Sequence, residues 1–258
     1  MYANYHTHTY RCNHATGTEK EYVERAIEKG LKILGFSDHT PYPFPKEYHS
    51  GMRMRVDELP DYVRTVENLK DEYKSDIEIH IGLEVEYYPR HFDELLKLVE
   101  DYPIEYFLLA QHHIGNEYDV EAGYCGMPTH SDDKLRQYVR QAIEGMETGK
   151  FLYLAHPDLI AYEGDMDLYD EEMRRLCLAA REHDLPLELN FLGLTEGRNY
   201  PFKRFWNLAS ELEMDVIYGC DAHRVDRVME DGIVERADHF LEGMHLHLIE
   251  EMKLPAHV

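Results

Sequence analysis

Apolar residues along this chain are gathered into short runs of strand length, many of them rich in β-branched side chains. Such runs, bounded by turn residues, are typical of strands buried in a sheet. With the start of the chain they predict seven strands, the later six at 32–36, 77–85, 106–110, 151–155, 185–189 and 216–219.

Longer segments with helical spacing and charged faces lie between these runs. They are 19–29, 56–73, 92–101, 132–147, 170–183 and 202–213, with a last helical stretch after Val225. A regular strand and helix alternation predicts a mostly parallel sheet covered by helices, and at 258 residues a distorted (β/α)7 barrel is favoured over an open sheet. No linker or low-complexity tract interrupts the pattern, so we expect a single domain over residues 1–258.

Composition narrows the possible partners. Hydrophobic residues make up 43% and charged residues 30% of the chain, as in a globular protein with a sizeable core. The formal net charge of −24 argues against a nucleic-acid or anionic membrane partner and favours a small substrate. Neither a targeting segment at Met1–Thr9 nor a long apolar span is evident, so we expect a cytoplasmic protein. Nothing in the sequence predicts an oligomeric state.

The four cysteines do not suggest a disulfide framework or a thiolate zinc site, because they are widely scattered and none forms a C-x-x-C pair. Free thiols are expected at Cys12, Cys125, Cys177 and Cys220. Cys12 lies between candidate metal ligands in the sequence and could approach their site.

Ionisable residues that can bind metals follow six of the seven predicted strands. They are His6 and His8, Asp38 and His39, Glu84, His112 and His113, His156, and Asp221 and His223; only the sixth strand ends in a non-ionisable residue, Asn190. All strand ends of a parallel barrel meet at one face, so these side chains should converge there. His6 and His8 are two residues apart and point the same way on an extended strand.

Chance alone is a possible source of some of these matches, since the chain has 17 histidines. Surface or capping roles are expected for His49, His80, His91, His130, His183, His239, His245, His247 and His257. A single buried histidine is also more often structural than a ligand. The strand-end set nevertheless predicts metal binding, and its nitrogen and oxygen donors without thiolate suit Zn, Mn or Fe.

Several short motifs resemble those of the polymerase and histidinol phosphatase (PHP) superfamily, in the family's order and over nearly the whole chain. They are His6-Thr7-His8, Cys12-Asn13-His14-Ala15, Ser37-Asp38-His39-Thr40, Gly82-Leu83-Glu84-Val85, His112, Ala155-His156-Pro157-Asp158 and Gly219-Cys220-Asp221-Ala222-His223. Within the superfamily, Cys-x-His-Ala after the first motif and Met-Arg-Met before the second long helix resemble the histidinol-phosphatase branch.

The resemblance implies a distorted seven-stranded barrel with three divalent metal ions. Position by position, the first ion would be held by His6, His8, Glu84 and Asp221, the second by a bridging Glu84 with His112 and His156, and the third by His14, His39 and His223. Two assignments leave an alternative open. Glu86 lies two residues past Glu84 on the same strand face, and His113 adjoins His112.

The activity implied by the resemblance is that of a phosphatase of histidine biosynthesis, which releases phosphate from L-histidinol phosphate with a metal-bridging hydroxide as nucleophile. Arg198 resembles a phosphate-binding arginine of that branch, and Arg53 and Arg55 are further candidates for substrate contacts. His113, Asp158 and a metal-bound water are candidates for the acid that protonates the leaving alcohol.

Other functions remain open at this point. The basic residue that the branch usually carries after Ile160 is absent, since the chain continues Ala161-Tyr162-Glu163, and this leaves other small phosphate esters as substrates. A phosphodiesterase or nuclease is the next alternative, although a polynucleotide normally meets a basic track. An amidohydrolase-type barrel would not explain Asp38-His39, His14 or the His beside Asp221. A non-catalytic protein with a structural metal is the most distant alternative hypothesis.

Overall fold

The computed structural model describes residues 1–119 and 123–255 and contains two parallel sheets. The first has the order β1-β2-β3-β4 and the second β5-β6-β7. The strands are β1 (Ala3–Asn4), β2 (Ile33–His39), β3 (Glu78–Val85), β4 (Tyr106–Leu109), β5 (Leu187–Asn190), β6 (Asp215–Gly219) and β7 (His247–Ile249).

Single β-bridges join the two sheets into a distorted barrel. Leu154 pairs with Leu109 on one side and with Leu187 on the other, and Thr7 pairs with Ala222 across the opposite seam. The predicted strand at 151–155 therefore occupies a strand position but has ladder geometry only at Leu154. Its extended path is short because the backbone turns sharply at His156, where φ is 29°.

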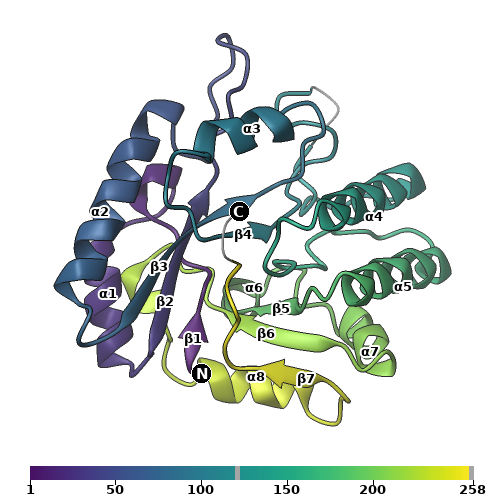
Figure 1. The fold of residues 1–258 in the computed structure, drawn as a ribbon. Coiled ribbons are helices and arrows are strands. Elements are labelled where there is room, and N and C mark those ends of the chain that lie inside the picture. Colours follow the sequence, from purple (N-terminus) through teal and green to yellow (C-terminus); the bar gives the residue numbers. More distant parts are fainter. Residues whose placement is uncertain (120–122, 256–258) are drawn as a thin grey trace.

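The described residues contain eight α-helices, most of which surround this sheet (Figure 1). They are α1 (Glu19–Glu28), α2 (Leu59–Glu72), α3 (Phe92–Val99), α4 (Asp132–Glu147), α5 (Met166–Glu182), α6 (Phe191–Glu196), α7 (Lys203–Glu211) and α8 (Ile233–Leu241), with 3₁₀ turns at Tyr10–Cys12, Val56–Glu58 and Val225–Arg227. The short α6 and the edge strand β7 were not predicted. No helix in the two described ranges is both long and apolar enough to cross a membrane.

Helix boundaries follow local capping chemistry. Thr18 and Glu21 form a reciprocal capping box at the start of α1, and the Ser131 and Asp165 side chains cap α4 and α5. These caps satisfy backbone N–H groups that have no partner within the helix. Each helix then buries one apolar face, such as Tyr22, Val23 and Ala26 of α1, against the sheet.

The interior of the barrel is packed with large side chains rather than open. Ala3, Tyr5, Ile33, Tyr106, Leu108, Ala110, Leu152, Tyr153, Ala155 and Ile217 form a separate inner cluster, against which Met252 and Leu254 of the C-terminal segment pack. Tyr106 crosses this interior and donates a hydrogen bond to the backbone oxygen of Tyr5 at 2.7 Å. One end of the barrel is thus filled with aromatic rings, and the polar residues gather at the other end.

Candidate metal centre

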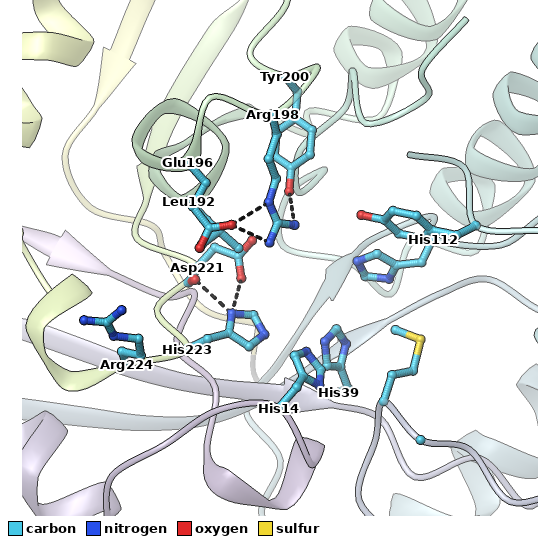
Figure 2. Close-up of a pocket in the computed structure, with 13 residues that line it drawn as sticks. His14, His39, His112, Leu192, Glu196, Arg198, Tyr200, Asp221, His223 and Arg224 are labelled. Carbon is cyan, nitrogen blue, oxygen red and sulfur yellow. Dashed lines mark hydrogen bonds and ion pairs between the residues drawn. The ribbon is translucent and has the colours of Figure 1, made fainter. Parts of the chain in front are cut away.

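The nine metal ligands that the family resemblance implied converge at the carboxyl end of the barrel. They come from the loops after β1, β4 and β6, from the ends of β2 and β3 and from the segment after Leu154. Figure 2 shows the outer part of this group, where His14, His39, His112, Asp221 and His223 face a common space. Residues up to 217 positions apart in the sequence thus meet, as a parallel barrel requires.

Glu84 lies at the centre of the cluster and is 1% exposed. Its Oε1 is 2.8 Å from Nε2 of His156, 3.4 Å from Nε2 of His6 and 3.6 Å from Nε2 of His112. Its Oε2 is 2.7 Å from Nδ1 of His39 and 3.5 Å from Nε2 of His8. One carboxylate therefore faces five imidazoles, the arrangement expected of a bridging ligand.

His6, His8 and Asp221 form the deepest group of possible ligands. The Nε2 atoms of the two imidazoles are 3.2 Å apart. They lie 3.5 Å and 3.1 Å from Oδ1 of Asp221, respectively. All three side chains are buried, and their donor atoms are close enough to share one ion.

A second tier of imidazoles lies nearer the surface. The His14 ring is 5.2 Å from the His39 ring and 4.6 Å from the His223 ring. His223 also joins His8 and His39 in one possible ligand group, and Cys12 and His14 in another. The thiol of Cys12 therefore does approach the site, although burial raises its pKa well above the ordinary value and keeps it protonated.

The cluster fits cations better than it fits an internal hydrogen-bond network. In the described chain, buried atoms without a hydrogen bond include Nδ1 of His8, His39 and His156, Oε2 of Glu84 and Nε2 of His223. The 2.7 Å approach of His39 to Glu84 lacks hydrogen-bond geometry, which is why both of its atoms belong to this set. Buried polar atoms without partners are costly, and their concentration here indicates that ions complete the site.

Protons compensate the same charges when no ion is bound. Burial lowers the pKa of His8, but hydrogen bonds with Asp221 and Asp38 and the charge of Glu84 outweigh it and raise this pKa to about 9. Burial likewise acts to raise the pKa of Glu84, yet the surrounding imidazoles hold it well below its usual range. Metal binding at this site would therefore displace protons.

A second layer of polar groups holds the imidazoles from behind. Nδ1 of His112 is 2.8 Å from Oε1 of Glu86, and Arg53 donates to both Glu86 oxygens at 3.1 and 2.9 Å. Of the two carboxylates left open by the sequence, Glu84 faces the cluster and Glu86 supports a histidine. His112 rather than His113 faces Glu84, while the backbone of His113 bridges to Tyr124.

Backbone conformation also marks the site. His156 and Asp221 have φ values of 29° and 47°, in a region that side-chain-bearing residues seldom adopt. Such conformations each cost about 1–3 kcal/mol and persist where the surrounding structure imposes them. Both residues lie two positions after a strand residue, Leu154 or Gly219, so the turn directs their side chains into the cluster instead of along the strand.

A cavity of about 450 Å³ opens over the cluster. Besides His14, His39, His112, Asp221 and His223, it is lined by Gly51, Met52, Tyr124, Leu192, Glu196, Arg198, Tyr200 and Arg224. Arg198 projects into this space, with Nε and Nη2 2.9 and 2.8 Å from Oε2 of Glu196 and Nη1 3.2 Å from the Tyr200 hydroxyl (Figure 2). The predicted phosphate-binding arginine thus lies beside the predicted ligands, and Arg224 adds a cation that the sequence had not indicated.

Four other predicted residues do not line this cavity among the described residues. Arg53 is 2% exposed and is held by Glu86 and Glu117, and Arg55 is exposed and pairs with Asp57. These positions do not support the substrate contacts predicted for them, because one guanidinium is fully engaged inside the protein and the other lies at the surface.

The two side chains predicted as acids also lie outside the cavity lining. Asp158 accepts hydrogen bonds from the backbone N–H of Phe202 at 2.5 Å and from Nε1 of Trp206 at 3.2 Å, so it holds the start of α7. His113 turns toward Tyr124, with ring centres 6.1 Å apart. The geometry does not support either as the proton donor to a leaving group.

Sequence reasoning missed Glu188 and gave no role to Asn190, and both residues lie behind the cluster. Glu188 is fully buried, and its Oε1 is 2.7 Å from Nδ1 of His6. Asn190 donates to Oδ2 of Asp221 at 3.0 Å. The available signal was a charged residue at the fourth position of the apolar run Leu-Pro-Leu-Glu-Leu, because a buried strand leaves such a residue no access to water.

Comparison with known sequences identifies relatives over most of the chain. The probable histidinol-phosphatase of Deinococcus radiodurans is 26% identical over 235 residues, which cover 86% of each protein. The histidinol-phosphatase of Bacillus subtilis is 24% identical over 254 residues, covering 86% of this chain and 94% of the relative.

Solved structures share the fold. A crystal structure of histidinol phosphate phosphatase from Lactococcus lactis, complexed with zinc, L-histidinol and phosphate, superposes with a TM-score of 0.75 at 19% identity and 98% coverage of both chains. A putative histidinol phosphatase from Listeria monocytogenes gives a TM-score of 0.68 at 22% identity, with 90% of this chain and 99% of that chain covered. The family model described as "PHP domain" matches residues 4–192, and the chain therefore belongs to the PHP family.

Proposed function

We propose that this protein is a metal-dependent phosphomonoesterase whose preferred substrate is L-histidinol phosphate. The observation that carries the proposal is the buried cluster centred on Glu84, which lies beneath a cavity that also presents Arg198. The names of the relatives from Deinococcus radiodurans and Bacillus subtilis support the same activity.

Three divalent ions would be held by the side chains that converge there. His6, His8, Glu84 and Asp221 would bind the first, Glu84, His112 and His156 the second, and His14, His39 and His223 the third, with Zn, Mn or Fe suited to these donors. When bound, such ions activate water near neutral pH and polarise phosphoryl oxygens. Cys12 adjoins the third group but stays protonated in the metal-free protein.

The remaining side chains of the cavity would bind and orient the substrate. Arg198 offers a forked cation to phosphate oxygens, and its partly exposed pair with Glu196 is weak enough to be exchanged for a doubly charged phosphate. Glu196 would then face the ammonium group of an amino-alcohol substrate. Tyr124, Tyr200, Leu192 and Met52 provide flat and apolar walls for an aromatic ring.

The cavity volume of about 450 Å³ suits a small phosphorylated molecule. Together with the net charge of −24, it disfavours a polynucleotide substrate.

The proposal is tested by purifying the protein without chelators and measuring its metals by mass spectrometry. Phosphate release from L-histidinol phosphate is then compared with release from sugar and amino-alcohol phosphates and from bis(p-nitrophenyl) phosphate. We expect bound transition metals and a clear preference for L-histidinol phosphate.

Two matched histidine variants complete this test. His6→Asn should abolish activity and reduce the metal content, whereas His239→Asn, on the exposed face of α8, should leave both unchanged. A preference for the diester, or a protein without metal, would contradict the proposal.

A further inference from the structure

Glu188 of β5 receives four hydrogen-bond donors on its two carboxylate oxygens. Oε1 lies 2.7 Å from Nδ1 of His6 and 3.4 Å from the Tyr153 hydroxyl, and Oε2 lies 3.0 Å from the backbone nitrogen of His156 and 2.9 Å from Nδ2 of Asn190. Its side chain is completely buried. The carboxylate of Glu188 thus contacts two predicted metal ligands, His6 and His156. It also contacts Asn190, which donates a hydrogen bond to a third predicted ligand, Asp221.

We propose that Glu188 and Asn190 are positioning residues, which fix His6, His156 and Asp221 in the orientation that metal binding needs, and that residue 219 is glycine to leave room for the Glu188 carboxylate. The inference rests on the proposed metal site. It concerns how the ligands of that site are held in place before an ion binds. It also assigns a role to Asn190, the end of the one predicted strand that carries no metal-ligand residue type.

The identity of each donor follows from the surrounding bonds. The backbone N–H of His156 can only donate. The amide of Asn190 is oriented because its Oδ1 accepts a hydrogen bond from the backbone N–H of Gly193 at 3.0 Å. Its two N–H groups then point to Oε2 of Glu188 and, at 3.0 Å, to Oδ2 of Asp221. Both amide hydrogens are used, and each meets a carboxylate.

This arrangement selects one form of the His6 ring. Nδ1 of His6 donates its hydrogen to Oε1 of Glu188 at 2.7 Å. This leaves Nε2 as the ring nitrogen that a metal ion would use, and it faces Nε2 of His8 at 3.2 Å and Oε1 of Glu84 at 3.4 Å. A carboxylate behind a histidine thus directs its other nitrogen toward a cation.

Gly219 supplies the space for this side chain. It lies opposite Asn190 in the β5 and β6 register. A Cβ at this position would overlap the carboxylate of Glu188. The φ of Gly219 is not positive, so its backbone conformation is open to any residue. Alanine is therefore disfavoured at this position by the lack of space for its Cβ. An alanine would displace Glu188 from His6 and from His156 together.

The first test is Glu188→Gln, because glutamine keeps the shape but replaces one acceptor oxygen with an NH₂ group that must face donors. Zn²⁺ affinity is measured by competition with a chromogenic chelator, and Co²⁺ binding by its visible absorption. We expect the affinity to fall on the order of 10 to 100-fold with an altered Co²⁺ spectrum. Glu172→Gln, a buried carboxylate on α5 away from the cluster, is the matched control and should change neither.

The second test is a double-mutant cycle of Gly219→Ala and Glu188→Ala. Gly219→Ala should weaken Zn²⁺ binding in the wild-type background and have little further effect when Glu188 is already alanine, because the obstructed carboxylate is gone. The circular dichroism and melting temperature of each metal-free variant show whether it is folded. Equal effects of Gly219→Ala in both backgrounds would overturn the proposed role of glycine.

The outcomes separate this inference from the proposed function. If the wild-type protein binds no Zn²⁺ or Co²⁺, the metal site itself is wrong. If the wild type binds both ions and folded Glu188→Gln binds them with unchanged affinity and spectrum, only the positioning role is overturned. Loss of affinity and a changed spectrum in Glu188→Gln, with Glu172→Gln unchanged, would support it.

Discussion

Arg198 can exchange its present partner, Glu196, for a ligand with little loss of interaction energy. Its pair with Glu196 is about one third exposed and joins residues two positions apart, so solvent screens it and it contributes on the order of 1 kcal/mol or less. A phosphate dianion offers more charge and more acceptor oxygens than one carboxylate. The pair with Glu196 therefore holds the guanidinium in the cavity and leaves it able to bind a phosphate.

Replacement of this arginine should reduce catalysis more than stability. We expect Arg198→Ala to lower kcat/KM for a phosphomonoester roughly 10 to 100-fold, since a charge-assisted hydrogen bond contributes about 1.5–3 kcal/mol. Arg198→Lys should recover only part of the loss because the forked contact is missing. The control is Arg204→Ala on α7, which breaks a similar pair with Asp170 of α5. Steady-state kinetics that are the same for both alanine variants would contradict the assignment.

Arg53 is the opposite case, because its charge is required inside the protein. It is 2% exposed and contacts Glu86 and Glu117, and removal would leave two buried carboxylates without a cation. We expect Arg53→Ala to lower the free energy of unfolding by about 3–5 kcal/mol in urea titrations. Arg55→Ala, at an exposed pair, should cost less than about 1 kcal/mol. Similar losses for the two variants would argue against a buried structural role for Arg53.

At the scale of elements, α7 depends on one carboxyl group outside the helix. Asp158 accepts the Phe202 N–H just before the helix and the Trp206 indole N–H inside it, and burial raises its pKa to about 7. In the unfolded chain the same carboxyl group has its ordinary pKa of 3.8. The folded state therefore holds a proton that the unfolded state has lost between about pH 4 and pH 7, and stability falls as pH rises through this window.

The variant Asp158→Asn should remove this pH dependence. The amide oxygen can still accept both hydrogen bonds, and no charge is buried when the pH rises. We expect the stability of the variant relative to wild type to increase between pH 5 and pH 8, as measured by urea unfolding at both values. A difference between the two proteins that does not change with pH would show that Asp158 is not neutral in the fold.

Element predictions succeeded where local pattern and capping agreed. The helix predicted at 132–147 is α4 with the same bounds, and Ser131 caps it. The strand predicted at 151–155 was reduced to bridges at Leu154, because its extent depends on neighbours that are distant in the sequence. The six residues of α6 carry no helical period of their own, and this helix starts because the Asn190 side chain caps the Gly193 N–H.

At the scale of the whole molecule, the C-terminal segment closes one end of the barrel. The hydroxyl of Tyr5 donates to the backbone oxygen of Met252 at 3.3 Å and accepts from its N–H at 3.1 Å. Met252 and Leu254 pack on the inner cluster, and the yellow end of the chain runs across the barrel in Figure 1. This contact joins the residue that follows β1 to the last described segment.

Deletion of residues 251–258 should therefore destabilise the barrel. Loss of two partly buried apolar side chains and of both Tyr5 hydrogen bonds should lower the free energy of unfolding by about 2–4 kcal/mol, read from the urea midpoint. Leu248→Ser, which changes a half-exposed apolar residue of β7, should have a much smaller effect. An unchanged midpoint after the deletion would show that the segment does not contribute to the barrel.

The sequence by itself determined the alternation of strands and helices and the chemistry at the strand ends. Both are local properties, because the spacing of apolar residues and the capping of helices depend on residues that are close together in the sequence. Membership of the PHP family followed from motifs such as His6-Thr7-His8. The prediction that six strand ends would meet also needed no coordinates, since parallel strands of a barrel share one carboxyl face.

Only the tertiary structure decided which of two glutamates, Glu84 or Glu86, faces the cluster. Glu84 and Glu86 share one strand face, yet Glu84 lies among five imidazoles and Glu86 lies against Arg53. The structure likewise gave Asn190 its place between Glu188 and Asp221 and placed Arg53 inside the protein. These choices depend on distances between strands that are far apart in the sequence, and no local pattern encodes such distances.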